Sequence, residues 1–171
     1  MVKNYINLNN GLENRYQFIP RTLVFIQHDQ KILFIEKKNH NSFVEGKLNG
    51  VGGHFEKGEE PYEAAIREIN EETGLVLKDL QLAAMIYIDT NKNPGILVFV
   101  FKAFSEDSSV IESREGKLLF LSREEIIKEK RIMKDIPFLL EVCDNHRKKD
   151  PPKYIKYHYS DSGELRIDII N

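Results

Sequence analysis

Short runs of apolar residues alternate with polar turns along this chain, and their spacing predicts a mixture of strands and helices. Two strand-like runs, at 22–26 and 32–35, flank the polar turn at 28–31, which predicts a hairpin. The segment before them, 1–20, is polar and rich in asparagine, and we interpret it as an extended arm or a short edge strand. The segment 37–50 is polar and basic with two glycines, which is typical of a loop.

A helical pattern follows, from about Glu60 to Thr73. Apolar residues recur there at spacings of three and four, Pro61 suits the first turn, and Gly74 suits the C-terminal stop.

The second half of the chain continues the alternation of strands and helices. We expect, in order, strands at 82–88 and 96–104 around a turn at 91–95, a short strand at 117–121, a helix beginning near Ser122, a helix over 134–147, and a terminal hairpin of 154–159 and 165–169 around a turn at 161–163. Ser122 and Glu125 resemble a capping box at the start of the first of these helices. The pattern predicts one mixed α/β domain over 1–171, with 1–20 as an N-terminal arm and 152–171 as a C-terminal hairpin.

Composition fits a single globular domain. The 171 residues are 41% hydrophobic and 30% charged, which is ordinary for such a domain. Their 25 basic and 27 acidic residues leave a formal charge of -2, which favours no DNA-binding role. One cysteine, Cys143, excludes an intramolecular disulfide, suits a reducing cytosol, and is expected to pack in the core. No apolar stretch is long enough to span a bilayer, so we expect a cytoplasmic protein without a membrane partner.

Three acids gather on the helix predicted at 60–73. Glu68, Glu71 and Glu72 are spaced at i, i+3 and i+4, so they share one face. Each close pair of like charges costs roughly a few tenths of a kcal/mol. Arg67 can pair with Glu63 at i, i+4, but the face still lacks enough cations. A solvated acidic face is one interpretation, and a bound divalent cation, for which carboxylates are preferred ligands, is the other.

The neighbouring glycines favour the metal site. Gly52 and Gly53 allow the backbone to approach a ligand closely, and Gly58 with Glu59 turns the chain directly into the helix. Loop, helix and carboxylates therefore predict a site for phosphate and metal.

The same residues carry a family resemblance. The run 53–59, a spacer of seven residues, and then 67–75 is similar to the Nudix box at all nine of its specified positions. The resemblance covers about 20–147. It implies an α/β/α sandwich with a mixed β-sheet, and hydrolysis of a nucleotide diphosphate linkage with Mg²⁺, for which Mn²⁺ can substitute.

The resemblance also implies roles for individual residues. Glu68, Glu71 and Glu72 would coordinate magnesium, and Arg67 would orient one of these carboxylates. Glu59 would support the network between loop and helix, while Gly53 and Gly74 would set backbone turns. Family members commonly add an acid from a later loop, as metal ligand or as base for water. Our candidates are Glu115 first and Glu112 second, with an exposed loop acid as the alternative reading of Glu115.

The segment 45–53 is similar to the MutT-like branch that acts on oxidised purine nucleoside triphosphates. This resemblance implies that Asn49 contacts the purine and that Gly52, Gly53 and His54 bind the substrate. A turn-forming Asn before Gly is the alternative for Asn49. His54 stands where that branch often has Lys, and Leu48 where an aromatic is frequent.

These residues predict a small-molecule nucleotide substrate, with 8-oxo-dGTP the first choice and a monophosphate and pyrophosphate as products. One alternative substrate is an RNA 5′ end, whose backbone could be bound by Lys37, Lys38 and Lys47. Another is ADP-ribose, although Pro94 is poorly placed for the proline that the ADP-ribose branch carries beyond the box. The third alternative is a catalytically silent domain that only binds a nucleotide. The sequence is compatible with a monomer or a homodimer, and the terminal hairpin either covers a pocket or forms a dimer contact.

Overall fold

The computed structural model describes residues 15–38, 46–111, 116–160 and 163–170. Its strands are β1 (Phe18–His28), β2 (Lys31–Lys37), β3 (Leu48–Asn49), β4 (Leu80–Ile88), β5 (Gly95–Phe104), β6 (Gly116–Ser122), β7 (Lys153–Tyr159) and β8 (Leu165–Ile170). Its helices are α1 (Pro61–Thr73), α2 (Arg123–Lys128) and α3 (Ile136–Asn145). None of these three described helices has the length and apolar character needed to cross a membrane.

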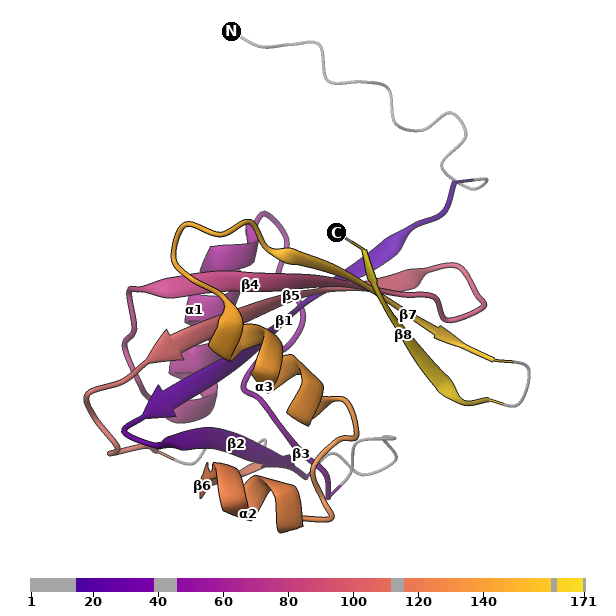
Figure 1. The fold of residues 1–171 in the computed structure, drawn as a ribbon. Coiled ribbons are helices and arrows are strands. Elements are labelled where there is room, and N and C mark those ends of the chain that lie inside the picture. Colours follow the sequence, from indigo (N-terminus) through magenta and orange to yellow (C-terminus); the bar gives the residue numbers. More distant parts are fainter. Residues whose placement is uncertain (1–14, 39–45, 112–115, 161–162, 171) are drawn as a thin grey trace, which may run out of the picture.

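All eight strands form one mixed sheet (Figure 1). Its order is β3-β2-β1-β5-β4-β7-β8, with β6 also paired to β2. The β1–β5 and β4–β7 pairs are parallel, and the other pairs are antiparallel. Helix α1 covers one face, and α2 and α3 cover the other. This arrangement confirms the expected α/β/α sandwich.

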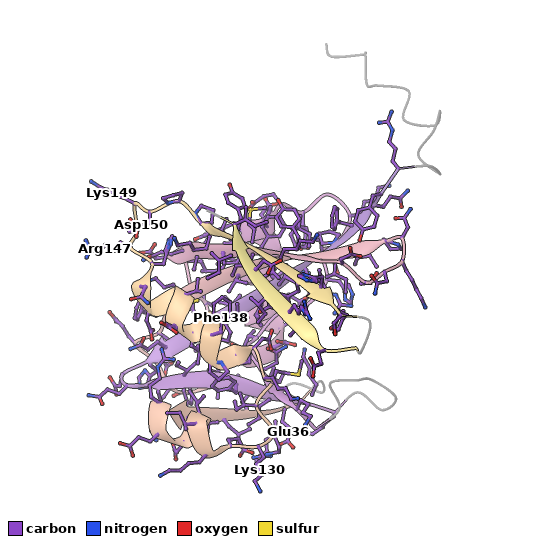
Figure 2. The ribbon with its side chains drawn as sticks, turned by 45° about the vertical axis from the view of Figure 1, so that its right-hand side comes forward. Glu36, Lys130, Phe138, Arg147, Lys149 and Asp150 are labelled. Atoms are coloured by element: carbon purple, nitrogen blue, oxygen red, sulfur yellow. The ribbon has the colours of Figure 1, made fainter. Side chains whose placement is uncertain are left out.

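Successive side chains of β1 point to opposite faces of the sheet and pack in a core cluster on each face. Val24 and Ile26 pack in the cluster that includes Ile69 of α1. Leu23 and Phe25 pack in the cluster that includes α3, where Phe138, labelled in Figure 2, lies against the buried side chains. Full burial of an aliphatic side chain of this size stabilises the fold by roughly 1.5–3 kcal/mol, so β1 anchors both layers.

Beyond its first residues, β2 diverges from β1. The two strands pair from Ile26–Leu33 to the turn, and β1 then pairs through isolated bridges with the glycine-rich segment, Val24 with Val51 and Arg21 with His54. This divergence places the glycines between the sheet and α1.

Helix α1 has the predicted ends. Glu60 is the N-cap of a capping box with Glu63, Pro61 occupies the first turn, and Gly74 ends the helix at φ 72°, where its N–H donates to the Asn70 carbonyl. The buried side of α1 includes Glu68 and Glu72, so the sheet holds these carboxylates in place.

The structure refines two of these predictions. Residues 18–20 lie in the segment predicted as an extended arm or a short edge strand, and they belong to β1 and pair with β5. Phe18 and Ile19 are adjacent apolar residues, each 39% exposed, so the sequence shows no alternation there. The expected loop 37–50 contains β3, which pairs with β2 through only two residues. The remaining elements lie within a few residues of the expected positions.

Cys143 packs in the core, as expected. It is buried in α3, and burial raises the pKa of its thiol to about 12. We therefore expect almost no reaction of the native protein with a thiol reagent at pH 8, and one thiol per chain in denaturant. Rapid labelling of native protein would contradict this packing.

Candidate active site

The glycine-rich segment is hydrogen-bonded to β1. The Thr22 N–H donates to the Gly53 carbonyl at 2.9 Å, and Val24 and Val51 exchange bonds of 2.7 and 3.1 Å. Gly52 has φ 143°, and a Cβ there would lie 2.4 Å from the Thr22 carbonyl oxygen. A Cβ on Gly53 would lie 2.4 Å from Glu68 Oε1. Two glycines therefore let the backbone lie directly between β1 and the carboxylates of α1.

These two contacts predict different results for two matched substitutions. Gly53→Ala meets the end of a flexible side chain, so we expect the Glu68 carboxylate to move, with a large loss of activity and little loss of stability. Gly52→Ala meets backbone at a positive φ, so we expect a loss of roughly 1–3 kcal/mol in the free energy of unfolding. Thermal unfolding and activity, measured on both variants, test the pair. Equal losses of stability would contradict this distinction.

Glu72 is a buried carboxylate whose two oxygens have different partners. Its side chain is 1% exposed, one oxygen is paired with Lys37 Nζ, and the other accepts from the Gly52 N–H at 2.9 Å. A buried charge is tolerated when it is paired and hydrogen-bonded in this way. Lys37 and Gly52 thus fix Glu72 against the glycine-rich segment.

Arg67 connects four other acceptors of the site. Its guanidinium donates to Glu59 at 2.6 and 3.1 Å, to Glu68 at 3.0 Å, to Glu71 at 2.9 Å, and to the His54 carbonyl at 2.8 Å. These bonds, chiefly those to Glu59, raise the pKa of Arg67 above its usual value. Arg67 therefore links the loop before α1 to the acidic turn.

The pairing of Arg67 with Glu63 that the sequence allowed is replaced by these contacts. Glu63 accepts from the Glu60 N–H in the capping box instead. Glu59 takes its place, and hydrogen bonds from Arg67 and then from the Glu56 N–H lower the pKa of Glu59.

Glu68, Glu71 and Glu72 differ in environment. The Glu71 side chain is 57% exposed, against 10% for Glu68 and 1% for Glu72. Glu68 and Glu71 share one nitrogen of Arg67, whereas Glu72 is bound to Lys37 and Gly52. Within the described ranges, no three acidic, histidine or cysteine side chains lie close enough to hold a metal ion. The helical spacing brings the acids to one turn, and the two cations then hold their carboxylates apart.

The charges of the site fit a divalent cation. Four carboxylates, those of Glu59, Glu68, Glu71 and Glu72, are paired with two cations, Arg67 and Lys37. These six groups alone carry two excess negative charges in a small, partly buried volume. A hard divalent ion balances that excess and prefers carboxylate oxygens as ligands.

Of the predicted substrate residues, Gly52, Gly53 and His54 lie beside this turn. Asn49, in β3, is half-buried, and its side-chain oxygen accepts from the Gly50 N–H at 2.9 Å, which matches its turn-forming interpretation. His54 is exposed and lies opposite Arg21. Partial burial and then the charges of Arg21 and Lys37 lower the pKa of His54, which favours a neutral ring. Glu115 and Glu112 lie outside the described residues.

Sequence reasoning missed two cations of the site. Lys37 was considered only as a contact for RNA, yet it pairs with Glu72, 35 positions later. Its place at the end of a strand next to Lys38 was the available signal. Arg21 was not considered. It is half-buried, desolvation lowers its pKa, and its buried Nε has no hydrogen-bond partner among the residues that the structure describes.

Comparison with known proteins agrees with this geometry. A family model described as "NUDIX domain" matches residues 18–140. The oxidized purine nucleoside triphosphate hydrolase of Mus musculus is 33% identical over 95 residues, which are 55% of this chain and 60% of that protein. The ADP-ribose pyrophosphatase of Methanocaldococcus jannaschii is 44% identical over 69 residues, which are 40% of this chain and 39% of that protein. The matched regions thus span less than two thirds of either relative.

A solved structure agrees with the fold. The crystal structure of the MutT protein of Bacillus halodurans has a TM-score of 0.67 and 24% identity, covering 88% of this chain and 98% of that one. Because the match covers 88% of this chain, the similarity in fold includes most of the sheet as well as the Nudix box.

Proposed function

The chain belongs to the Nudix family, and we propose that it is a magnesium-dependent pyrophosphohydrolase that converts a nucleoside triphosphate into a monophosphate and pyrophosphate. The observation that carries this proposal is the acidic turn of α1. It lies against the backbone of Gly52 and Gly53, and its three carboxylates together with that of Glu59 outnumber their described partner cations, Arg67 and Lys37, by two. Enzymes of this family use divalent cations for their chemistry.

We assign the metal to Glu68, Glu71 and Glu72, whose carboxylates the ion would draw together from the separate positions that they have beside Arg67 and Lys37. Glu71 is the exposed ligand, Glu68 lies under Gly53, and Glu72 reaches the site beside Gly52. A cation held there would neutralise phosphate charge and would activate the attacking water. Arg67 holds Glu68 and Glu71 in position, so it is a positioning residue.

Cations next to the acidic turn receive the anionic substrate. Lys37 and Arg21 add positive charge at the glycine-rich segment, where His54 joins them as a neutral hydrogen-bonding group. Water attacks one phosphorus in line, the bridging P–O bond breaks, and the diphosphate product leaves with the bridging oxygen. The proton of the water passes to a carboxylate, for which Glu115 is our candidate.

A purine substrate is supported by Asn49. An amide places a donor and an acceptor side by side, which matches a purine edge. The mouse relative is named for oxidised purine nucleoside triphosphates, and 8-oxo-dGTP is therefore our first choice.

Asn49→Ala tests this role. We expect the ratio of kcat/KM for 8-oxo-dGTP to that for dCTP to fall by about 10-fold or more, because an interaction with the base is lost. Lys47→Ala is the control, since Lys47 is exposed two residues earlier, and it should keep the ratio. An unchanged ratio in Asn49→Ala would leave Asn49 with a turn-forming role alone.

A second candidate substrate is ADP-ribose, which the name of the archaeal relative favours. A pyrophosphatase screen over 8-oxo-dGTP, unmodified nucleotides, ADP-ribose, dinucleoside polyphosphates and triphosphorylated RNA separates the classes. We expect the highest kcat/KM with the oxidised purine. A preference for ADP-ribose or RNA would replace the substrate assignment, and absence of turnover throughout would indicate a silent domain.

A further inference from the structure

Strand β8 ends the sheet. Among the described strands, it pairs on one side with β7 and with none on the other. Figure 2 turns this side of the molecule forward and shows the β7–β8 hairpin, in yellow, beside α3. Ile169 and Ile170 of this strand are 51% and 50% exposed. A six-residue edge with exposed apolar side chains is a template for another strand.

The hydrogen-bond pattern shows which backbone groups face outward. The Ser160 N–H donates to the Glu164 carbonyl at 2.9 Å, so Glu164 faces β7. Along a strand of an antiparallel pair, the backbone N–H and C=O groups of successive residues point alternately toward and away from the partner strand. The Tyr157 carbonyl accepts from the Asp89 N–H on the side of β7 away from β8, which agrees with this alternation. The N–H and C=O groups of Leu165, Ile167 and Ile169 therefore point away from β7.

The side chains of β8 are self-complementary about Ile167. In an antiparallel pair with a two-fold axis there, Ile167 lies opposite its own copy and Leu165 lies opposite Ile169. Arg166 then lies opposite Asp168, twice. Opposite charges directly across a pair of strands stabilise the pairing, and like charges destabilise it.

The burial of the β8 side chains on each face of the sheet fits such a pair. Leu165 and Ile167 already pack against the core cluster on the α3 side, and Ile169, which points to the same side, is exposed. A second chain brings its Leu165 next to this Ile169. On the other side, Asp168 lies 3.4 Å from His158 Nδ1, and both Arg166 and Asp168 are exposed.

From this register we propose that the chain forms a two-fold homodimer through antiparallel pairing of β8, centred on Ile167. The outward groups of Leu165, Ile167 and Ile169 supply up to six backbone hydrogen bonds, because each residue meets a residue of the same set. The sheet then continues through both chains. This inference does not depend on the proposed function, because three strands separate β8 from β1.

Charge reversal tests the register. Arg166→Asp and Asp168→Arg each place like charges opposite one another in the dimer, so sedimentation velocity should show association weakened by about tenfold or more in each variant alone. Mixing the two variants restores opposite charges at both positions. We expect a heterodimer in the mixture at concentrations where the separate variants are monomers.

Three outcomes would overturn the proposal. One is a wild-type chain that stays monomeric at high concentration. Another is a pair of single variants that both dimerise as well as wild type. The last is a mixture that remains monomeric although circular dichroism and thermal unfolding show both variants folded. The double variant, with both charges exchanged, should dimerise like wild type and so separates a loss of pairing from a loss of folding.

Discussion

Replacing Glu71 with Gln is expected to lower kcat by at least about 10²-fold while leaving the melting temperature within about 1–2 °C of wild type. The side chain is 57% exposed and accepts a hydrogen bond from Arg67 at the surface, so the fold depends little on its charge. As a proposed metal ligand, however, it supplies charge for which a neutral amide is a poor substitute.

Glu63→Gln is the matched control. Glu63 lies two turns earlier on the same helix and takes part in the capping box rather than in the acidic turn. It should lose at most about 1 kcal/mol of stability and keep its turnover. Near-normal turnover by the Glu71 variant on the preferred substrate would contradict the assignment of the metal to this turn.

Arg67→Ala is expected to have the largest combined effect, with a loss of about 2–3 kcal/mol in stability and of about 10²-fold or more in kcat. The guanidinium is 20% exposed and donates to Glu59, Glu68, Glu71 and the His54 carbonyl. Its removal leaves neighbouring carboxylates without their shared cation, and the loop before α1 loses its link to the helix.

The pH dependence of unfolding tests how much the pairing of Arg67 with Glu59 stabilises the protein. The lowered pKa of Glu59 means that its pairing stabilises the protein above the usual carboxyl pKa and is lost as the pH falls through the lowered one. Between about pH 5 and pH 3, wild type should therefore lose more stability than Arg67→Ala. Arg67→Lys should keep part of the stability but little of the activity, because one ammonium does not reproduce the fork of bonds. Parallel acid unfolding of wild type and Arg67→Ala would argue against the role of Glu59.

The sequence predicted the parts of the site that depend on local spacing. The helical period put Glu68, Glu71 and Glu72 on one turn, and Gly52 and Gly53 indicated a close backbone approach. Caps and turns are equally local, so both ends of α1 were predicted.

Local spacing could not predict contacts between segments that are distant in the sequence. Lys37 meets Glu72 because β2 diverges from β1, and no local pattern carries that divergence. The extension of β1 to Phe18 depends on β5, and β3 depends on its pairing with β2. Such features are determined by tertiary pairing, which overrides local preference.

Binding of Mn²⁺, followed by electron paramagnetic resonance in the presence of a non-hydrolysable nucleoside triphosphate, tests the central claim most directly. We expect wild-type protein to remove free Mn²⁺ from solution with about one ion per chain or more, Mg²⁺ to compete for the site, and Glu71→Gln to bind much more weakly. A folded wild-type chain that binds neither ion with this or any other phosphorylated ligand would contradict the account.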